Sequence, residues 1–215
     1  DSTWVRPTEN SVEALEHGMS HVDGVELDLR LSTDGELMLW HDELFTGNLP
    51  KKSRCPELME SQEIREMGVD SFDDLLQCKE FTTLWQTSSK TVNIELKVPH
   101  PVAKISDHAN HLAKMISKID SSLVELDLPK RSTMIYGFSP KISEAVKISQ
   151  TKIPNTQLSP HLRSWGKGKM KRLIGSPNFI SNTVSGLVKD RRRKGMPVVG
   201  MALHYLHGWE RFVHP

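Results

Sequence analysis

Short apolar segments alternate with amphipathic, helix-like segments along most of the 215-residue chain. About six segments have the composition of buried strands: 22–31, 91–98, 132–138, 156–162, 178–182 and 196–203. Helices are expected at about 9–19 (capped by Thr8), 71–78, 101–119, 139–149 and 183–195. This alternation predicts a parallel sheet with crossover helices. A TIM-type (β/α)8 barrel and an open, doubly wound sheet both fit this pattern, and the absence of a glycine-rich phosphate loop after any strand weakens a Rossmann-type interpretation of the open sheet.

The length fits a single barrel domain over residues 1–215. Residues 36–41 form a short strand after a Ser-Thr-Asp-Gly turn, and we expect this strand to lie beside the barrel. The stretch from about 45 to 70 is polar and contains glycine and proline, which indicates a loop-rich insertion. The six remaining strands are two fewer than an eight-stranded barrel needs.

Charge and cysteine content exclude several classes of protein. The formal net charge is only +1, which disfavours a nucleic-acid partner or a membrane partner held by bulk electrostatics. No apolar run approaches the ~20 residues of a membrane-spanning helix, so we expect no stable membrane insertion. Cys55 and Cys78 are too few for a disulfide framework and favour a cytoplasmic location. The sequence opens at Asp1 without methionine, so a removed leader is the alternative.

Acidic side chains interrupt two of the predicted strands with a spacing of two. Glu26 and Asp28 share one face of the first strand, and Glu95 and Lys97 share one face of the second. Three carboxylates at strand ends would suit a hard cation such as Mg²⁺, Ca²⁺ or Mn²⁺, and Lys97 would suit an anionic substrate group. His41 ends the short side strand and offers an acid or base near neutral pH. The simpler alternative is a solvated strand face.

Ordered motifs over residues 9–140 resemble the glycerophosphodiester phosphodiesterase family. The matching segments are Glu9-Asn10-Ser11, Asp23-Gly24-Val25-Glu26-Leu27-Asp28, Thr33-Asp34-Gly35, His41-Asp42, Ile94-Glu95-Leu96-Lys97 and Gly137-Phe138-Ser139-Pro140. The resemblance implies a TIM-type barrel with a role in glycerol and lipid metabolism. It also implies metal-dependent hydrolysis of small glycerophosphodiesters to an alcohol and glycerol 3-phosphate.

The resemblance assigns a role to five residues. Glu26, Asp28 and Glu95 would bind a divalent cation, with Mg²⁺ or Ca²⁺ favoured and Mn²⁺ as an alternative. His41 would be the general acid that protonates the leaving alkoxide, and Lys97 would bind the substrate phosphate.

Two features of the family have no counterpart in this sequence. The family begins with a strand ending in His-Arg-Gly, which supplies a second catalytic histidine, and it closes with a Gly-x-Asp-x-Ile-x-Thr-Asp strand. We therefore expect the first and last barrel strands to be missing from the sequence given. A lysophospholipase D-like activity and a catalytically inactive barrel that binds phosphate-bearing ligands remain as alternatives.

Two basic clusters lie late in the chain, at Trp165–Arg172 and Arg191–Lys194. Solvated surface is the simpler interpretation of both. The functional interpretation is weak contact with anionic head groups near the barrel mouth, and Trp165 makes the first cluster the better candidate for it.

Overall fold

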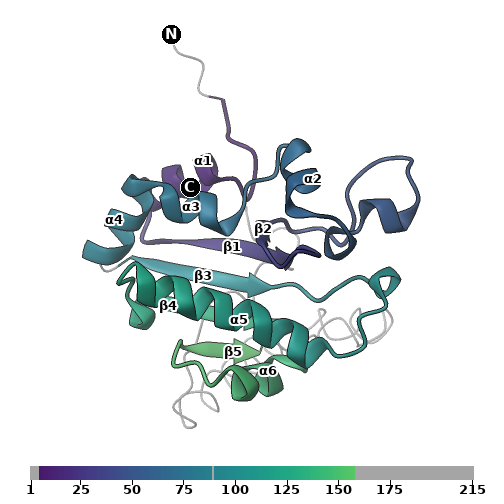
Figure 1. Cartoon of the computed structure of the whole chain (residues 1–215). Helices are drawn as coiled ribbons and strands as arrows, with labels where there is room; N and C mark the ends of the chain where they lie inside the picture. The colour runs from purple at the N-terminus through teal and green to yellow at the C-terminus, as the bar shows by residue number, and fades with distance from the viewer. Residues whose placement is uncertain (1–4, 89, 158–215) are drawn as a thin grey trace, which may run out of the picture. The chain divides into compact units, whose positions relative to one another are not determined.

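The computed structural model describes residues 5–88 and 90–157, which lie within one compact unit spanning 1–157 (Figure 1). Its strands are β1 (Gly24–Leu31), β2 (Leu37–Leu39), β3 (Thr91–Leu96), β4 (Thr133–Gly137) and β5 (Asn155–Gln157). Its α-helices are α1 (Val12–His21), α2 (Ser61–Glu66), α3 (Phe72–Gln77), α4 (Lys79–Thr87), α5 (His108–Glu125) and α6 (Ile142–Ser149). Short 3₁₀ turns are η1 (Lys51–Arg54), η2 (Pro56–Leu58), η3 (Pro101–Ala103) and η4 (Lys130–Ser132).

The strands form one sheet in the order β2-β1-β3-β4-β5. β1, β3, β4 and β5 are parallel, and helices connect them along the chain, as the alternation predicts. β2 is antiparallel to the end of β1, with Leu29 opposite Leu39. The side position predicted for residues 36–41 is therefore confirmed. Parallel strands present their carboxyl ends at one edge of the sheet, and that edge is where polar side chains of several strands can meet.

Helices pack on the sheet through a continuous apolar core. Helix α1 packs against β1 and α4, α3 packs against β2 and α4, and α6 packs against β5 and α5 (Figure 1). Leu27 and Leu29 of β1 and Ile94 of β3 are completely buried in this core. Because side chains alternate along a strand, the intervening Glu26 and Asp28 are placed on the opposite face. The same alternation that builds the core thus separates the acids from it.

The starts of α1 and α5 differ from the predictions for particular local reasons. Ser11, not Thr8, caps α1, because its hydroxyl accepts from the Ala14 amide while Asn10 adopts a left-handed backbone with φ of 58°. The helix predicted from 101 to 119 is interrupted: η3 ends at Ala103, and the φ of 55° at the following Lys104 is incompatible with a continuing helix. Asp107 caps a new start, and α5 then runs to Glu125.

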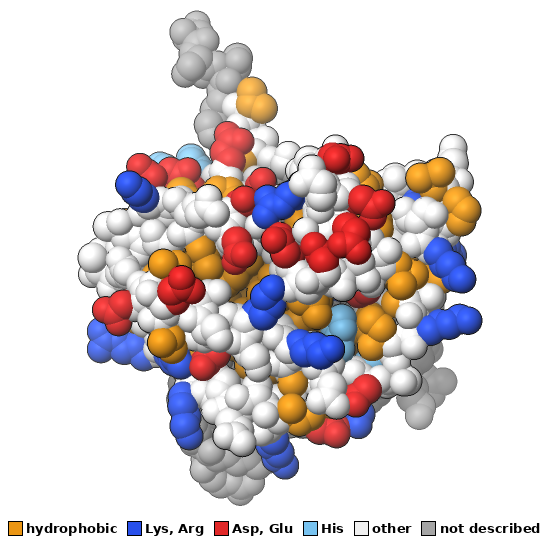
Figure 2. All heavy atoms as spheres, viewed as in Figure 1, with side chains coloured by type: hydrophobic (Ala, Val, Ile, Leu, Met, Phe, Trp, Pro, Cys, Tyr) orange, Lys and Arg blue, Asp and Glu red, His pale blue; other side chains and the backbone are white. Residues whose placement is uncertain are grey.

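The predicted insertion at about 45–70 contains η1, η2 and α2 and has a small apolar core of its own. Phe45 is buried in that core and packs against Trp40, with ring centroids 4.6 Å apart. Exposed Glu60, Glu63 and Glu66 give α2 an acidic outer surface (Figure 2). This surface is that of a solvated helix, and the insertion is joined to the sheet through its apolar side.

Four of the six predicted barrel strands are confirmed as β1, β3, β4 and β5, although each is shorter than predicted or begins at a different residue. The capped helix predicted at 71–78 is α3, and Ser71 forms its capping box with Asp74. Helix α4 was not predicted. The strands predicted at 178–182 and 196–203, the helix at 183–195 and both basic clusters lie outside the described residues.

Candidate metal and phosphate site

Asp28 and Glu95 are register partners on the neighbouring parallel strands β1 and β3. Glu26 lies two residues before Asp28 on the same face. One oxygen of each of these three carboxylates lies within 4.8 Å of the others. Asp28 and Glu95 are each only 7% exposed, whereas Glu26 keeps contact with solvent. The structure therefore brings together the three carboxylates that the sequence singles out.

Lys97 neutralises part of this cluster. Its Nζ lies 2.6 Å from Glu95 Oε1 and 2.7 Å from Asp28 Oδ1. The contact with Asp28 lacks hydrogen-bond geometry, so Asp28 Oδ1 is a buried oxygen with a charge partner but no hydrogen-bond donor among the described residues. Such an oxygen is poorly satisfied, because burial removes the water that would otherwise bind it.

The carboxyl group of Glu26 has an unusual pKa. Burial of the carboxyl group and the neighbouring charge of Asp28 raise its pKa to about 7, although the Tyr136 hydroxyl donates a hydrogen bond to Glu26 Oε1 and opposes that shift. The residue keeps an accessible edge, but protein atoms surround its carboxyl end closely enough to disfavour the charge. Three acids in close proximity cannot all remain ionised without a compensating cation.

Burial also raises the pKa of Glu95, and the Lys97 ammonium partly opposes this shift. His41 lies close enough for its charge to stabilise the Glu95 carboxylate, but it makes no hydrogen bond to the three acids. Its imidazole is 64% exposed, and Nδ1 lies 2.8 Å from Asp42 Oδ1. A carboxylate only accepts, so this contact places the hydrogen on Nδ1 and makes Nε2 the nitrogen that exchanges a proton.

Sequence reasoning missed two residues that support the site. Tyr136 of β4 binds Glu26, and its position in an apolar strand pattern gave no sign of this role. The Asn10 carboxamide donates to the Asp28 carbonyl at 3.0 Å and accepts from the Asp28 amide at 3.1 Å. This paired contact fixes the β1 backbone at a cluster residue, and the Glu-Asn-Ser motif was the only available signal for it.

The donor set fits a hard divalent cation. Glu26, Asp28 and Glu95 offer only oxygen ligands, which Mg²⁺, Ca²⁺ and Mn²⁺ prefer. The raised pKa of Glu26, to which the charges of Asp28 and Glu95 contribute, indicates that the cluster has more negative charge than Lys97 compensates. A bound cation would remove this imbalance.

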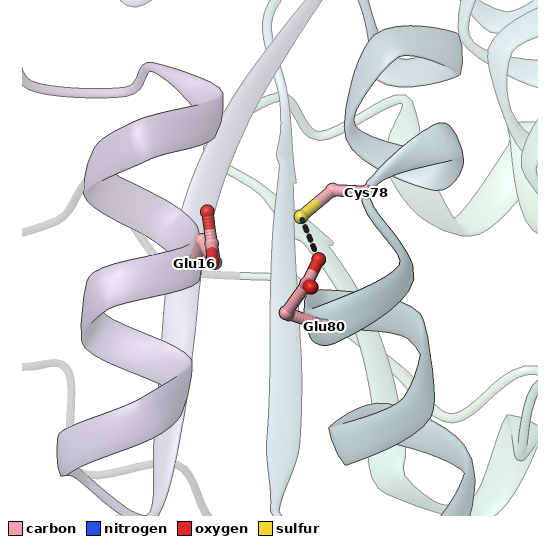
Figure 3. A group of neighbouring side chains, drawn as sticks. All are labelled: Glu16, Cys78 and Glu80. Carbon is pink, nitrogen blue, oxygen red and sulfur yellow. Dashed lines mark hydrogen bonds between the residues drawn. The ribbon is translucent and has the colours of Figure 1, made fainter.

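A second group of possible ligands lies on the helical side of the sheet, where Glu16 of α1 faces Cys78 and Glu80 at the start of α4 (Figure 3). Burial raises the pKa of the Cys78 thiol, with a further contribution from Glu16 and Glu80. Glu80 is exposed, and the thiol already contacts it at 3.9 Å. Because exposed acidic groups are common without a metal, we assign no metal site to this group.

The sequence profile of the glycerophosphoryl diester phosphodiesterase family matches residues 4–200. The chain belongs to this family. None of the curated proteins compared with the chain matches it by sequence.

Solved structures show the same fold at low sequence identity. A glycerophosphodiester phosphodiesterase from Parabacteroides distasonis is 18% identical with a TM-score of 0.55, over 74% of this chain and 63% of that one. A Galdieria sulphuraria protein assigned to the same activity is 15% identical with a TM-score of 0.60, over 91% and 78%. An Oleispira antarctica phosphodiesterase, solved with sn-glycerol-3-phosphate, is 16% identical with a TM-score of 0.52, over 79% and 67%.

These similarities confirm the TIM-barrel type of fold. Of the five described strands, the four parallel ones (β1, β3, β4 and β5) correspond to strands of such a barrel. The match with a protein from Silicibacter pomeroyi covers 60% of that chain, so this sequence spans less than two thirds of it and of the Parabacteroides protein. Within residues 5–88 and 90–157, no helix has the length and apolar character needed to cross a bilayer.

Proposed function

We propose that this protein hydrolyses glycerophosphodiesters to an alcohol and glycerol 3-phosphate with the help of a divalent cation. The observation that carries the proposal is the meeting of Glu26, Asp28 and Glu95 within 4.8 Å, with Lys97 beside them. Family membership and the glycerol-3-phosphate complex of the Oleispira phosphodiesterase support the same substrate class.

Each site residue has a distinct task in this proposal. Glu26, Asp28 and Glu95 would hold the cation, which would supply Lewis-acid stabilisation of charge on the phosphoryl oxygens. The Lys97 ammonium, which lies against Asp28 and Glu95, would bind a phosphate oxygen of the substrate. His41 donates its Nε2 proton to the departing alkoxide, which is otherwise a poor leaving group. Asp42 holds Nδ1 and thereby orients the imidazole.

The test measures release of glycerol 3-phosphate from glycerophosphocholine by the full chain, with Mg²⁺, Ca²⁺ or Mn²⁺ and with a chelator. Loss of several kcal/mol of charge stabilisation should lower turnover about 10³-fold in chelator and in Glu95→Gln. Glu80→Gln is the matched control, because it removes a carboxylate from the second group without touching the site.

Other outcomes would contradict parts of the proposal. Unchanged turnover in chelator or in Glu95→Gln would refute the metal assignment. Binding of glycerol 3-phosphate without any turnover would favour the inactive phosphate-binding barrel. Release of choline from lysophosphatidylcholine in preference to glycerophosphocholine would favour a lysophospholipase D-like activity.

A further inference from the structure

Arg30 is a buried cation next to the site, two residues after Asp28 on the same face of β1. It is only 2% exposed. Its Nη1 lies 2.8 Å from Glu57 Oε1 and donates to the Val98 carbonyl at 3.1 Å. Its Nη2 donates to the carbonyl of His41 at 3.2 Å. One guanidinium thus bonds three separate segments of the chain.

Two of these contacts secure segments that carry proposed site residues. His41 follows the three-residue strand β2, whose pairing with β1 ends at Leu39. In the part of the chain that the structure describes, the contact with Arg30 is the hydrogen bond that holds the His41 backbone. Val98 follows Lys97 directly, beyond the end of β3. Arg30 therefore ties His41, which follows β2, and Val98, which follows β3, to β1, the strand that carries Asp28.

Glu57 keeps the guanidinium in place. It belongs to η2 in the insertion, is 4% exposed, and accepts from the Cys55 thiol at 3.0 Å through its second oxygen. Buried ion pairs contribute little net stability, because desolvation offsets most of their attraction, and an apolar pair of similar volume often stabilises a fold equally well. An apolar pair, however, could not hold the carbonyls of His41 and Val98.

We propose that Arg30 is a positioning residue that sets the place of His41, and of the chain beyond Lys97, relative to the carboxylate cluster. Glu57, which belongs to the insertion, is the buried counter-ion that holds the Arg30 guanidinium in position. The catalytic consequence rests on the proposed phosphodiesterase activity, whereas the anchoring of the His41 backbone does not.

The test compares the full chain with the double variant Arg30→Met/Glu57→Met. Replacing both partners avoids an uncompensated buried charge, so the free energy of unfolding should fall by no more than the loss of the hydrogen bonds that the pair makes to the His41 and Val98 carbonyls and to the Cys55 thiol. We expect kcat for glycerophosphocholine to fall roughly tenfold or more, because small displacements of catalytic groups are expensive, with a smaller change in KM. Within 40–45 the amide that the structure shows hydrogen-bonded is that of Phe45, which donates to the Arg54 carbonyl at 2.7 Å, so hydrogen exchange at this amide should accelerate at least about tenfold as the nearby anchor at His41 is lost.

Two further variants keep the test decisive. Arg65→Met removes a comparable arginine that pairs with Glu36 and Asp74 on the α2 side; it should lower stability while leaving exchange at 40–45 and kcat unchanged. Arg30→Lys keeps the charge opposite Glu57 but lacks the planar guanidinium that reaches two carbonyls. It replaces the double variant in the test if the double variant does not fold. It should show the same fall in kcat and the same acceleration of amide exchange.

The two proposals fail in distinguishable ways. Wild-type exchange at 40–45 in a folded Arg30 variant would overturn the positioning role, whether or not the protein is active. Wild-type kcat in that variant would also overturn it. A wild-type protein that hydrolyses no glycerophosphodiester would refute the proposed function, and the exchange measurement would still decide the role of Arg30.

Discussion

Asp28 and Glu95 lie directly opposite each other on β1 and β3, far apart in the sequence but paired in register. Parallel pairing directs both side chains to the same face, where Glu26 joins them and Lys97 lies between two of the three carboxylates. The cluster is thus a consequence of strand register, and its concentrated negative charge is the property from which the chemistry of the site follows.

Cation binding should release a proton near neutral pH. The pKa of Glu26 is raised to about 7 without a cation, so below that pH the carboxyl is mostly protonated and must lose its proton to bind a metal. We expect the affinity for Mn²⁺ or Mg²⁺ to fall up to about tenfold per pH unit below 7 and to level off above 8. Calorimetry in two buffers of different ionisation enthalpy would measure the number of protons released on binding. A cation affinity that does not change between pH 6 and pH 8 would contradict the prediction.

His41→Gln should lower kcat by about 10²–10⁴-fold for substrates with an alkoxide leaving group, because general-acid catalysis supplies a gain of that size. The loss should be much smaller for an analogue that releases p-nitrophenolate, which departs without protonation. Steady-state rates on both substrates provide the check. Equal losses on the two leaving groups would show that His41 has a task other than proton donation.

Tyr136→Phe removes the hydroxyl that donates to Glu26. This hydrogen bond lowers the Glu26 pKa, so its loss should raise that pKa further and weaken cation binding at pH 7 by about 10–100-fold, the usual effect of losing a partner of a ligand. At pH 8.5 the difference from the wild type should shrink, because a larger share of Glu26 is then ionised in the variant and nearly all of it in the wild type. Titrations of Mn²⁺ at the two pH values test this, and an equal deficit at both would argue for a change in geometry instead.

Asp74→Asn should weaken the start of α3 and alter acid stability. Burial of Asp74 raises its pKa, but hydrogen bonds from the Ser71 amide and hydroxyl and the Arg65 guanidinium outweigh burial and hold the pKa below its usual value. Its stabilising contribution is therefore present above the ordinary pKa near 4 and is lost as the pH falls through the lower, folded-state value.

Urea unfolding of Asp74→Asn at pH 7 should show a loss of about 1 kcal/mol, and that deficit should narrow toward pH 3. Asp73→Asn is the matched control, because Asp73 is exposed in the same first turn. A deficit in Asp74→Asn that is the same at pH 3 and pH 7 would contradict the assigned cause.

Local patterns predicted much of the fold and most of the site. The spacing of two between Glu26 and Asp28 and between Glu95 and Lys97 required only the alternation of side chains along a strand. The apolar strands and the Ser71 cap were likewise visible, because each depends on residues close together in the chain. The helix start at His108 was not visible, since it depends on the left-handed backbone of Lys104, which no single residue type signals.

The sequence by itself determined that carboxylates alternate with core residues on two strands and that a histidine follows the neighbouring side strand. Only the tertiary structure decided what surrounds them: Tyr136 from β4 on Glu26, Asn10 on the Asp28 backbone, and Arg30 held by Glu57 beneath His41. Each of these contacts joins residues distant in sequence, and each requires burial that removes competing water. Hydrogen bonds of this kind depend on position in three dimensions, which the local order of residue types does not specify.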